Sequence, residues 1–161
     1  MSLPIAQPLT LRTRASSLSQ AEDKALPTLG GNILGGLRIL VVDDEPDSRE
    51  LVATILKRCG GEVRCSQSAA DAIRAFKEWQ PDLLISDIAM PHEDGFILLE
   101  KLRKLRSKRA KEIPAVALSA YASDEDRSLA LSKGFQLHLP KPIEPEHLVT
   151  SIAAALGRET S

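Results

Sequence analysis

The amino-acid sequence predicts an α/β fold in which a doubly wound parallel sheet of five strands lies between layers of helices. Short apolar segments alternate along the chain with longer segments of helical periodicity, and the connections are too long for hairpins. Several of the apolar segments carry apolar residues on both faces, which is typical of parallel strands covered on both sides. The predicted strands comprise residues 38–43, 62–66, 82–87, 113–119 and 135–140.

A helix is expected after each predicted strand. These helices should end near Cys59, Trp79, Arg106, Lys133 and Leu156. Pro46 suits a first helical turn, because the amide hydrogen that proline lacks would be unpaired there in any residue. Ser68 and Ser123 are each followed three residues later by an aspartate, a spacing related to the capping box. Gly60 and Gly134 stand where left-handed helix stops are expected.

Composition gives part of the strand order. The first, third and fourth predicted strands are the most apolar, so we expect them at the centre of the sheet. The fifth contains His138 and ends in Pro140, and proline favours an edge because it cannot donate a hydrogen bond to a neighbouring strand. An edge strand implies an open sheet, since a closed barrel has no edge and would need more strand-helix units.

Length, hydrophobic content and charge exclude several classes of protein. A chain of 161 residues with 43% hydrophobic residues suits one domain and a tail, and a net charge of -1 gives no attraction to nucleic acid or membrane. No apolar run approaches the roughly 18 residues of a membrane span, and the first residues do not resemble a secretory signal. We therefore expect a cytoplasmic segment that contacts neither membrane nor nucleic acid.

Two local features are interpreted as structural. Cys59 and Cys65 match no metal or redox spacing, so we expect two buried, reduced thiols. Six basic residues between positions 103 and 111 are expected to form a solvated helix end and a flexible loop. A nucleic-acid site is the less favoured interpretation of that basic run.

Residues 1–36 are interpreted as a tail or linker, because they mix proline, serine, threonine, glycine and charge without sustained periodicity. Ser19 and Glu22 have capping-box spacing and predict a short helix over residues 19–26. The folded domain is expected over residues 37–157, followed by a disordered end at 158–161. We expect no DNA-binding output segment behind the domain.

Polar residues follow four of the five predicted strands. These residues are Asp43 and Asp44 after the first strand, Asp87 after the third, Ser119 after the fourth and Lys141 after the fifth. Because parallel strands all end at the same edge of a sheet, these side chains are expected to converge. Each of them alone fits a helix cap or a solvated loop, whereas together they indicate a site with Asp87 as its reactive residue.

The residue types in this cluster favour phosphoryl chemistry. Three crowded carboxylates repel one another unless a cation compensates, and their hard oxygen ligands suit Mg²⁺, with Mn²⁺ as the alternative ion. A carboxylate so placed can attack phosphorus and form an acyl phosphate while Lys141 neutralises charge on the phosphoryl oxygens. Ser119 is placed to hydrogen-bond a further phosphoryl oxygen.

Four motifs, in this order and spacing, resemble the receiver domain of two-component response regulators. They are VVDDEPDSRE at 41–50, SDIAMPHEDG at 86–95, LSAYA at 118–122 and PKP at 140–142. The resemblance covers residues 37–157 and implies a flavodoxin-like (βα)5 fold with strand order 2-1-3-4-5. It also implies a phosphoryl group taken from phosphohistidine of a histidine kinase or a histidine phosphotransfer domain.

The resemblance assigns roles by position in these motifs. It makes Asp87 the phosphoacceptor and a metal ligand, Asp43 and Asp44 the other metal-binding acids, Ser119 a switch hydroxyl and Lys141 the lysine that contacts phosphate. On phosphorylation, the face made by the fourth helix, the fifth strand and the fifth helix is implied to change shape. The same face is the implied surface for a homodimer.

Further implications concern the neighbours of these residues. The backbone carbonyl of Ala89 is an implied metal contact, and the bond between Lys141 and Pro142 is implied to be cis. Ala89 offers no polar group to an attacking water and Tyr121 is large enough to shield the site, so we expect a moderately long-lived phosphoryl group. His138 replaces the more usual tyrosine or phenylalanine, and it acts either as a packing element or in a weakened switch with added pH dependence.

Two other functions compete with a phosphoryl-accepting receiver. One is a phosphorylation-independent interaction module of the same fold, which would not need to keep the acids, the hydroxyl and the lysine together. The other is a magnesium-dependent phosphohydrolase with an aspartyl-phosphate, which usually has a second acid where this chain has Ala89. The favoured receiver performs chemistry on itself, by phosphorylation from a donor and autodephosphorylation, and is not a metabolic enzyme.

The first residues of the chain indicate what kind of protein the domain belongs to. Residues 3–8, LPIAQP, resemble the exit from a histidine-kinase ATP-binding domain. We therefore expect a C-terminal receiver of a hybrid sensor histidine kinase. A stand-alone receiver with a disordered N-terminal tail is the alternative.

Overall fold

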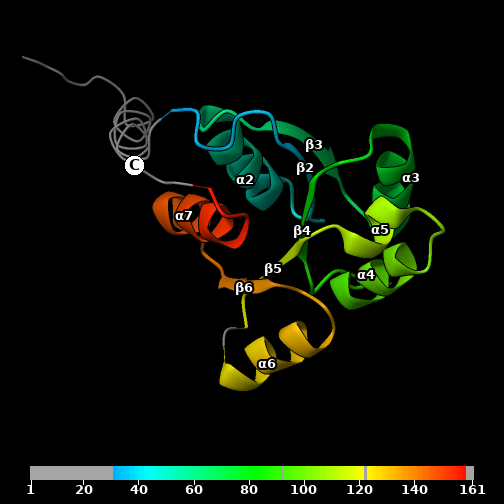
Figure 1. Cartoon of the computed structure of the whole chain (residues 1–161). Coiled ribbons are helices and arrows are strands. Elements are labelled where there is room, and N and C mark those ends of the chain that lie inside the picture. Colours follow the sequence, from blue (N-terminus) through cyan, green and yellow to red (C-terminus); the bar gives the residue numbers. More distant parts are fainter. Residues whose placement is uncertain (1–30, 92, 122, 159–161) are drawn as a thin grey trace, which may run out of the picture.

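A computed structural model describes residues 31–91, 93–121 and 123–158, and a five-stranded parallel sheet lies at its centre (Figure 1). The strands are β2 (Arg38–Val42), β3 (Glu62–Ser66), β4 (Leu83–Asp87), β5 (Ala115–Ser119) and β6 (Leu137–Pro140). They pair in the order β3-β2-β4-β5-β6. This is the predicted order 2-1-3-4-5, so the predicted fold class is confirmed.

Helices cover both faces of the sheet. They are α2 (Pro46–Arg58), α3 (Ala69–Trp79), α4 (Gly95–Arg103), α5 (Lys108–Glu112), α6 (Asp124–Ser132) and α7 (Pro145–Ala155). One buried cluster joins α2 and α7 to the sheet, and a second joins α3, α4, α5 and α6 to the other face. Ile39 and Val41 of β2 belong to the first cluster and Leu40 and Val42 to the second, as strand alternation requires.

Burial along the strands follows their position in the sheet. Every residue of β4 and β5 is buried, which fits their central place between two helical layers. At the β6 edge, Pro140 is exposed. The predicted centre and edge of the sheet are therefore confirmed.

Helix ends follow the local sequence. The Ser68 and Ser123 hydroxyls accept hydrogen bonds from the third residue of the following helix, at 3.1 Å in both cases. Pro46 begins α2, and Gly60 and Gly134 have φ angles of +96° and +110°. These boundary predictions are confirmed.

The basic run differs from its prediction. The helix expected to reach Arg106 ends at Arg103, and the additional helix α5 lies where a flexible loop was expected. Ser107 starts α5 by accepting a hydrogen bond from Ala110 N at 3.2 Å. Lys111 Nζ donates to the carbonyl of Leu105 at 2.7 Å, so part of this charge closes the connection between the two helices. Helix α5 has only five residues, which is too short for a helical pattern of apolar residues to be recognised in the sequence.

Smaller differences concern two strands and a cysteine. The last two strands begin at Ala115 and Leu137, each two residues after its predicted start. Both cysteines are free, as predicted, but only Cys59 is buried while Cys65 is exposed at the β3 edge of the sheet. Edge strands have one uncovered side, so a thiol on such a strand can face solvent.

The N-terminal prediction lies partly outside the described residues. Residues 1–30, the helix expected over 19–26 and residues 159–161 belong to that undescribed part. Residues 31–36 form turns, and Leu34 among them is buried in the cluster beneath α2 and α7. Within the described segments, none of the helices has the length and apolarity needed to cross a membrane.

Candidate functional site

The predicted acids and lysine converge where the parallel strands end. Asp43 follows β2, Asp87 is the last residue of β4, and Lys141 follows β6. One carboxylate oxygen from each of Asp43, Asp44 and Asp87 lies within 4.8 Å of the other two. The parallel topology thus joins residues that are up to 98 positions apart in the sequence.

Lys141 is the cation in contact with this acidic cluster. Its Nζ donates to Asp43 Oδ2 at 2.9 Å, to Asp87 Oδ2 at 3.1 Å and to Glu45 Oε1 at 3.3 Å. The lysine side chain is 14% exposed, and the Asp43 and Asp87 side chains are 0% and 6% exposed. Because little water screens these charges, the lysine offsets the repulsion between the two buried carboxylates.

Backbone hydrogen bonds orient the same two carboxylates. Asp87 Oδ1 accepts from the N–H of Ala89 at 2.9 Å, and Asp43 Oδ1 accepts from the N–H of Glu45 at 3.0 Å. Each carboxylate therefore has one oxygen fixed by the backbone and the other turned toward the lysine ammonium. This arrangement holds the Asp87 carboxylate in one orientation.

Burial and charge act in opposite directions on these groups. Burial raises the pKa of Asp87 and the charge of Asp43 adds to this effect, so that together they exceed the lowering by the Ala89 N–H and by Lys141. Burial alone would lower the pKa of Lys141, but hydrogen bonds and charge from Asp43 and Asp87 outweigh it and raise that pKa. Lys141 is therefore a permanent cation in this site, while ionised Asp87 is held at a cost in free energy.

Ligand chemistry at this edge fits a small divalent cation. The three aspartates offer hard carboxylate oxygens, which suit Mg²⁺ or Mn²⁺ better than a metal that prefers sulfur or nitrogen ligands. Asp44 is half-buried and has no hydrogen bond or ion pair to another described residue, so its carboxylate is available. Ala89, whose carbonyl is the predicted fourth contact, is exposed beside Asp87.

Sequence reasoning missed three residues that shape the site. Glu45 is the third acid on the lysine, and Arg49 Nη1 donates to the carbonyl of Asp43 at 2.7 Å. A Cβ on Gly95 would lie 2.7 Å from the carbonyl oxygen of Asp87 and 2.9 Å from Cα of Ile88. The glycine thus lets α4 begin directly against Asp87.

Ser119 lies at the same edge but belongs to a second group of residues. Its Oγ accepts from the N–H of Tyr121 at 2.9 Å, and its carbonyl accepts from the N–H of Lys141 at 2.9 Å. The peptide bond between Lys141 and Pro142 is cis. Among the described residues, the Ser119 hydroxyl has no hydrogen bond to the acidic cluster, and the Tyr121 side chain is 66% exposed. Ser119 therefore lies at the edge that carries Asp87, but its hydroxyl is bonded to the backbone of Tyr121 and not to the acids.

His138 is buried on the face of the sheet that α6 covers. It pairs with Ala117 of the second cluster, and its Nε2 has no hydrogen-bond partner among the described residues. Burial lowers the pKa of His138; the charge of Asp126 and the backbone of Tyr121 oppose this effect, and Arg127 adds to it. The ring is consequently a neutral, packed side chain.

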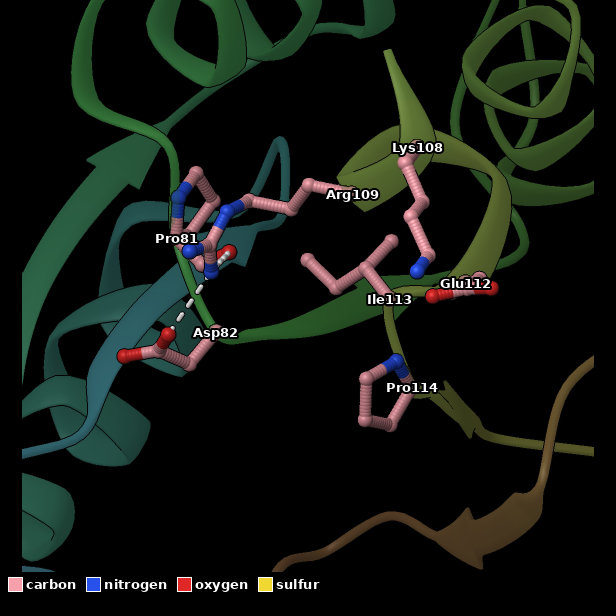
Figure 2. A pocket seen from close by; sticks show the side chains of 7 residues that line it. All are labelled: Pro81, Asp82, Lys108, Arg109, Glu112, Ile113 and Pro114. Carbon is pink, nitrogen blue, oxygen red and sulfur yellow. Dashed lines mark hydrogen bonds and ion pairs between the residues drawn. The ribbon is translucent and has the colours of Figure 1, made fainter.

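A cavity of about 380 Å³ lies at the opposite edge of the sheet, where β4 and β5 begin (Figure 2). Its lining residues are Pro81, Asp82, Lys108, Arg109, Glu112, Ile113 and Pro114. Arg109 Nη1 spans one wall by donating to Asp82 Oδ1 at 2.8 Å and to the carbonyl of Pro81 at 3.2 Å. None of the residues with predicted roles lines this cavity, so it is separate from the acidic cluster.

Known proteins are similar to this chain in sequence. A family model described as the response regulator receiver domain matches residues 39–153. An uncharacterized 14.6 kDa protein of Leptolyngbya boryana is 42% identical over 116 residues, covering 72% of this chain and 87% of that protein. Hybrid signal transduction histidine kinase D of Dictyostelium discoideum is 35% identical over 134 residues, covering 79% of this chain but 9% of the kinase.

A solved structure has a similar fold. Chemotaxis protein CheY4 of Vibrio cholerae matches with a TM-score of 0.68 and 27% sequence identity, covering 73% of this chain and 97% of that one. The chain thus spans nearly all of CheY4 and of the Leptolyngbya protein, and a small part of the kinase.

Replacement of Lys141 by methionine should lower the free energy of unfolding at neutral pH without added metal by about 3 kcal/mol, because it leaves two buried carboxylates without a cation. Urea denaturation measures this change. Lys77→Met is the matched control, since Lys77 is exposed on α3 and has no ion pair with another described residue. Equal stabilities of the two variants would contradict the role assigned to Lys141.

His138 should make stability depend on pH. Its folded pKa lies below the ordinary value of 6.5, so the stability contributed by the neutral ring is complete above that pH and is lost as pH falls through it. His138→Phe should flatten the decline in stability as pH falls through 6.5, as measured by urea denaturation. His147→Gln, at an exposed position in α7, should retain the wild-type slope. An unchanged slope in His138→Phe would show that other groups cause it.

Proposed function

The chain belongs to the response regulator receiver domain family, and we propose that it accepts a phosphoryl group on Asp87 in two-component or phosphorelay signalling. The proposed donor is the phosphohistidine of a histidine kinase or of a histidine phosphotransfer domain. The observation that carries the proposal is the contact of Lys141 Nζ with both Asp43 and Asp87, at 2.9 and 3.1 Å, beside a third aspartate.

The proposed reaction follows from the charges at this edge. An oxygen of Asp87 attacks phosphorus, the phosphorus–nitrogen bond of phosphohistidine breaks, and the imidazole leaves with the bonding electron pair and a proton from solvent. Lys141 is close enough to Asp87 to turn from its carboxylate to a phosphoryl oxygen and to neutralise charge there. A divalent cation held by Asp43, Asp44 and Asp87 would supply further neutralisation of the phosphoryl oxygens.

We further propose that the phosphoryl group changes the face made by α6, β6 and α7. Ser119, the proposed switch hydroxyl, is the last residue of β5, and His138 lies on the neighbouring strand β6. A groove of about 460 Å³ runs over this face, and its lining includes His138, Leu131 and His147. The exposed Leu131 gives the groove an apolar contact for a partner or a second copy of the chain.

The proposed context is a receiver at the C-terminal end of a hybrid histidine kinase, in the cytoplasm. Support comes from the similarity to part of the Dictyostelium hybrid kinase and from the LPIAQP segment at residues 3–8. A stand-alone receiver is the alternative. The reading frame of the gene upstream of the codon for Leu3 would distinguish the two contexts.

Phosphorylation should be visible in the intact mass of the protein. Incubation with acetyl phosphate and Mg²⁺ should add one phosphoryl group to the wild-type chain and none to Asp87→Ala, because the variant lacks the attacking oxygen. A phosphoryl adduct on Asp87→Ala, or no adduct on the wild-type chain, would contradict the proposal. Absence of the adduct would favour an interaction module that works without phosphorylation.

Tyr121 should slow hydrolysis of the phosphoryl group. Ala89 has no polar side chain to activate water, and Tyr121, a large residue, contacts the Ser119 hydroxyl through its backbone N–H at 2.9 Å. Loss of the adduct, followed by intact mass after the donor is removed, should be faster in Tyr121→Ala than in the wild-type chain. Equal rates in the two proteins would show that Tyr121 does not shield the site.

A further inference from the structure

Residues 31–36, which we name the N-terminal clasp, pack against the domain instead of leaving it. Leu34 in the clasp is 0% exposed, and its N–H donates to the carbonyl of Cys59, just after α2, at 2.8 Å. The N–H of Leu37 donates back to the carbonyl of Leu34 at 3.1 Å, which closes the turn before β2. The clasp therefore contributes Leu34 to the core just before the first strand begins.

The clasp fits closely against the end of α2. A Cβ on Gly60 would lie 2.3 Å from Asn32 Oδ1, and one on Gly35 would lie 2.5 Å from Asn32 Nδ2. Glycines at these two positions leave the space that the Asn32 side chain occupies. By contrast, a Cβ on Gly31 would meet nothing within 4 Å. Close packing thus begins after Gly31.

Arg158 joins the clasp to α7. Its Nη1 donates to the carbonyl of Ile33 at 3.2 Å and to that of Gly35 at 2.9 Å, and its N–H donates to the carbonyl of Ala153 in α7 at 2.7 Å. Hydrogen bonds from a charged donor are stronger than those between neutral groups. One side chain therefore links two clasp carbonyls to the end of the last helix.

The clasp lies at the edge of the sheet opposite to Asp87. Helices α2 and α7 both return from the edge where the strands end, so their C-terminal ends, at Cys59 and Leu156, lie toward the edge where the strands begin. Figure 1 shows the clasp in blue, passing alongside α2 on its way to β2. The chain before Gly31 is thereby attached away from the acidic cluster.

We propose that the clasp is energetically coupled to the C-terminal end of α7, so that a change in the position of one alters the stability of the other. This coupling needs no phosphorylation, because it follows from the contacts of Arg158 and Leu34 alone. Its use in signalling rests on the proposed function, in which α7 is part of the face that responds to a phosphoryl group on Asp87. Coupling free energies are reciprocal, so disturbance of either side should be detected on the other.

The first test removes the link. In the full chain, Arg158→Ala should increase the hydrogen-exchange rate of the Leu34 amide, measured by NMR, at least about tenfold, because it removes two charge-assisted hydrogen bonds. The amides of β4 and β5 should exchange at the wild-type rate. Arg106→Ala is the matched control, since Arg106 is exposed and has no hydrogen bond to another described residue.

The second test changes a residue of the clasp and measures amide exchange at the C-terminal end of α7. Gly35→Ala displaces the Asn32 side chain and should speed exchange of the Leu156 and Arg158 amides, which are bonded to the carbonyls of Ile152 and Ala153. Gly31→Ala, which meets open space, should leave those rates unchanged. Faster exchange in the clasp with wild-type rates in α7 would overturn the coupling, and so would a wild-type rate of the Leu34 amide in Arg158→Ala.

A third measurement separates this inference from the proposed function. Exchange of the Leu34 amide is compared before and after addition of acetyl phosphate and Mg²⁺, with the adduct followed by intact mass in the same sample. A changed rate in the wild-type chain and an unchanged one in Arg158→Ala would support transmission through the clasp. An unchanged rate in a fully phosphorylated wild-type chain would overturn transmission, whereas failure to form the adduct would count against the proposed function and leave the first two tests decisive for the coupling.

Discussion

Burial of two carboxylates beside one ammonium is the interaction on which the site depends. Asp43 and Asp87 sit at the ends of neighbouring strands because a parallel sheet ends all its strands at one edge. Neither carboxylate is screened by water, so their repulsion must be offset by Lys141, which reaches them from the strand at the edge of the sheet. The arrangement holds negative charge at high free energy, which suits the attack on phosphorus and the binding of a cation that we propose for this site.

Much of this could be predicted from sequence, because the fold converts strand order into proximity. Asp43, Asp87 and Lys141 each stand just where an apolar segment stops, and parallel topology brings such positions together whatever their separation along the chain. Helix α5 was missed since five residues are too few for periodicity, and Gly95 was missed since its role is a 2.7 Å approach between Cβ and a backbone oxygen that only coordinates reveal. Glu45 was missed for a similar reason, because its ion pair depends on how a loop folds back.

The two edges of the sheet are organised for different purposes. The acidic cluster and Lys141 lie at the edge that carries Asp87. The opposite edge holds the N-terminal clasp, in which Leu34 is buried in the core and Gly35 accepts a hydrogen bond from Arg158. Helix α7 connects these regions, since it packs on the sheet, borders the groove near His138 and ends at the clasp. Residues 31–36 are thus structurally part of the domain, although their composition resembles that of a linker.

The identity of the modified atom is the most direct test of the central claim. After phosphorylation with acetyl phosphate and Mg²⁺, borohydride reduction converts an aspartyl phosphate to homoserine, which peptide mass spectrometry locates in the sequence. Homoserine at position 87 alone is the result expected for a carboxylate presented by Lys141 and the Ala89 N–H. Homoserine at position 43 or 44, with Asp87 unmodified, would contradict the assignment of Asp87 as the phosphoryl acceptor.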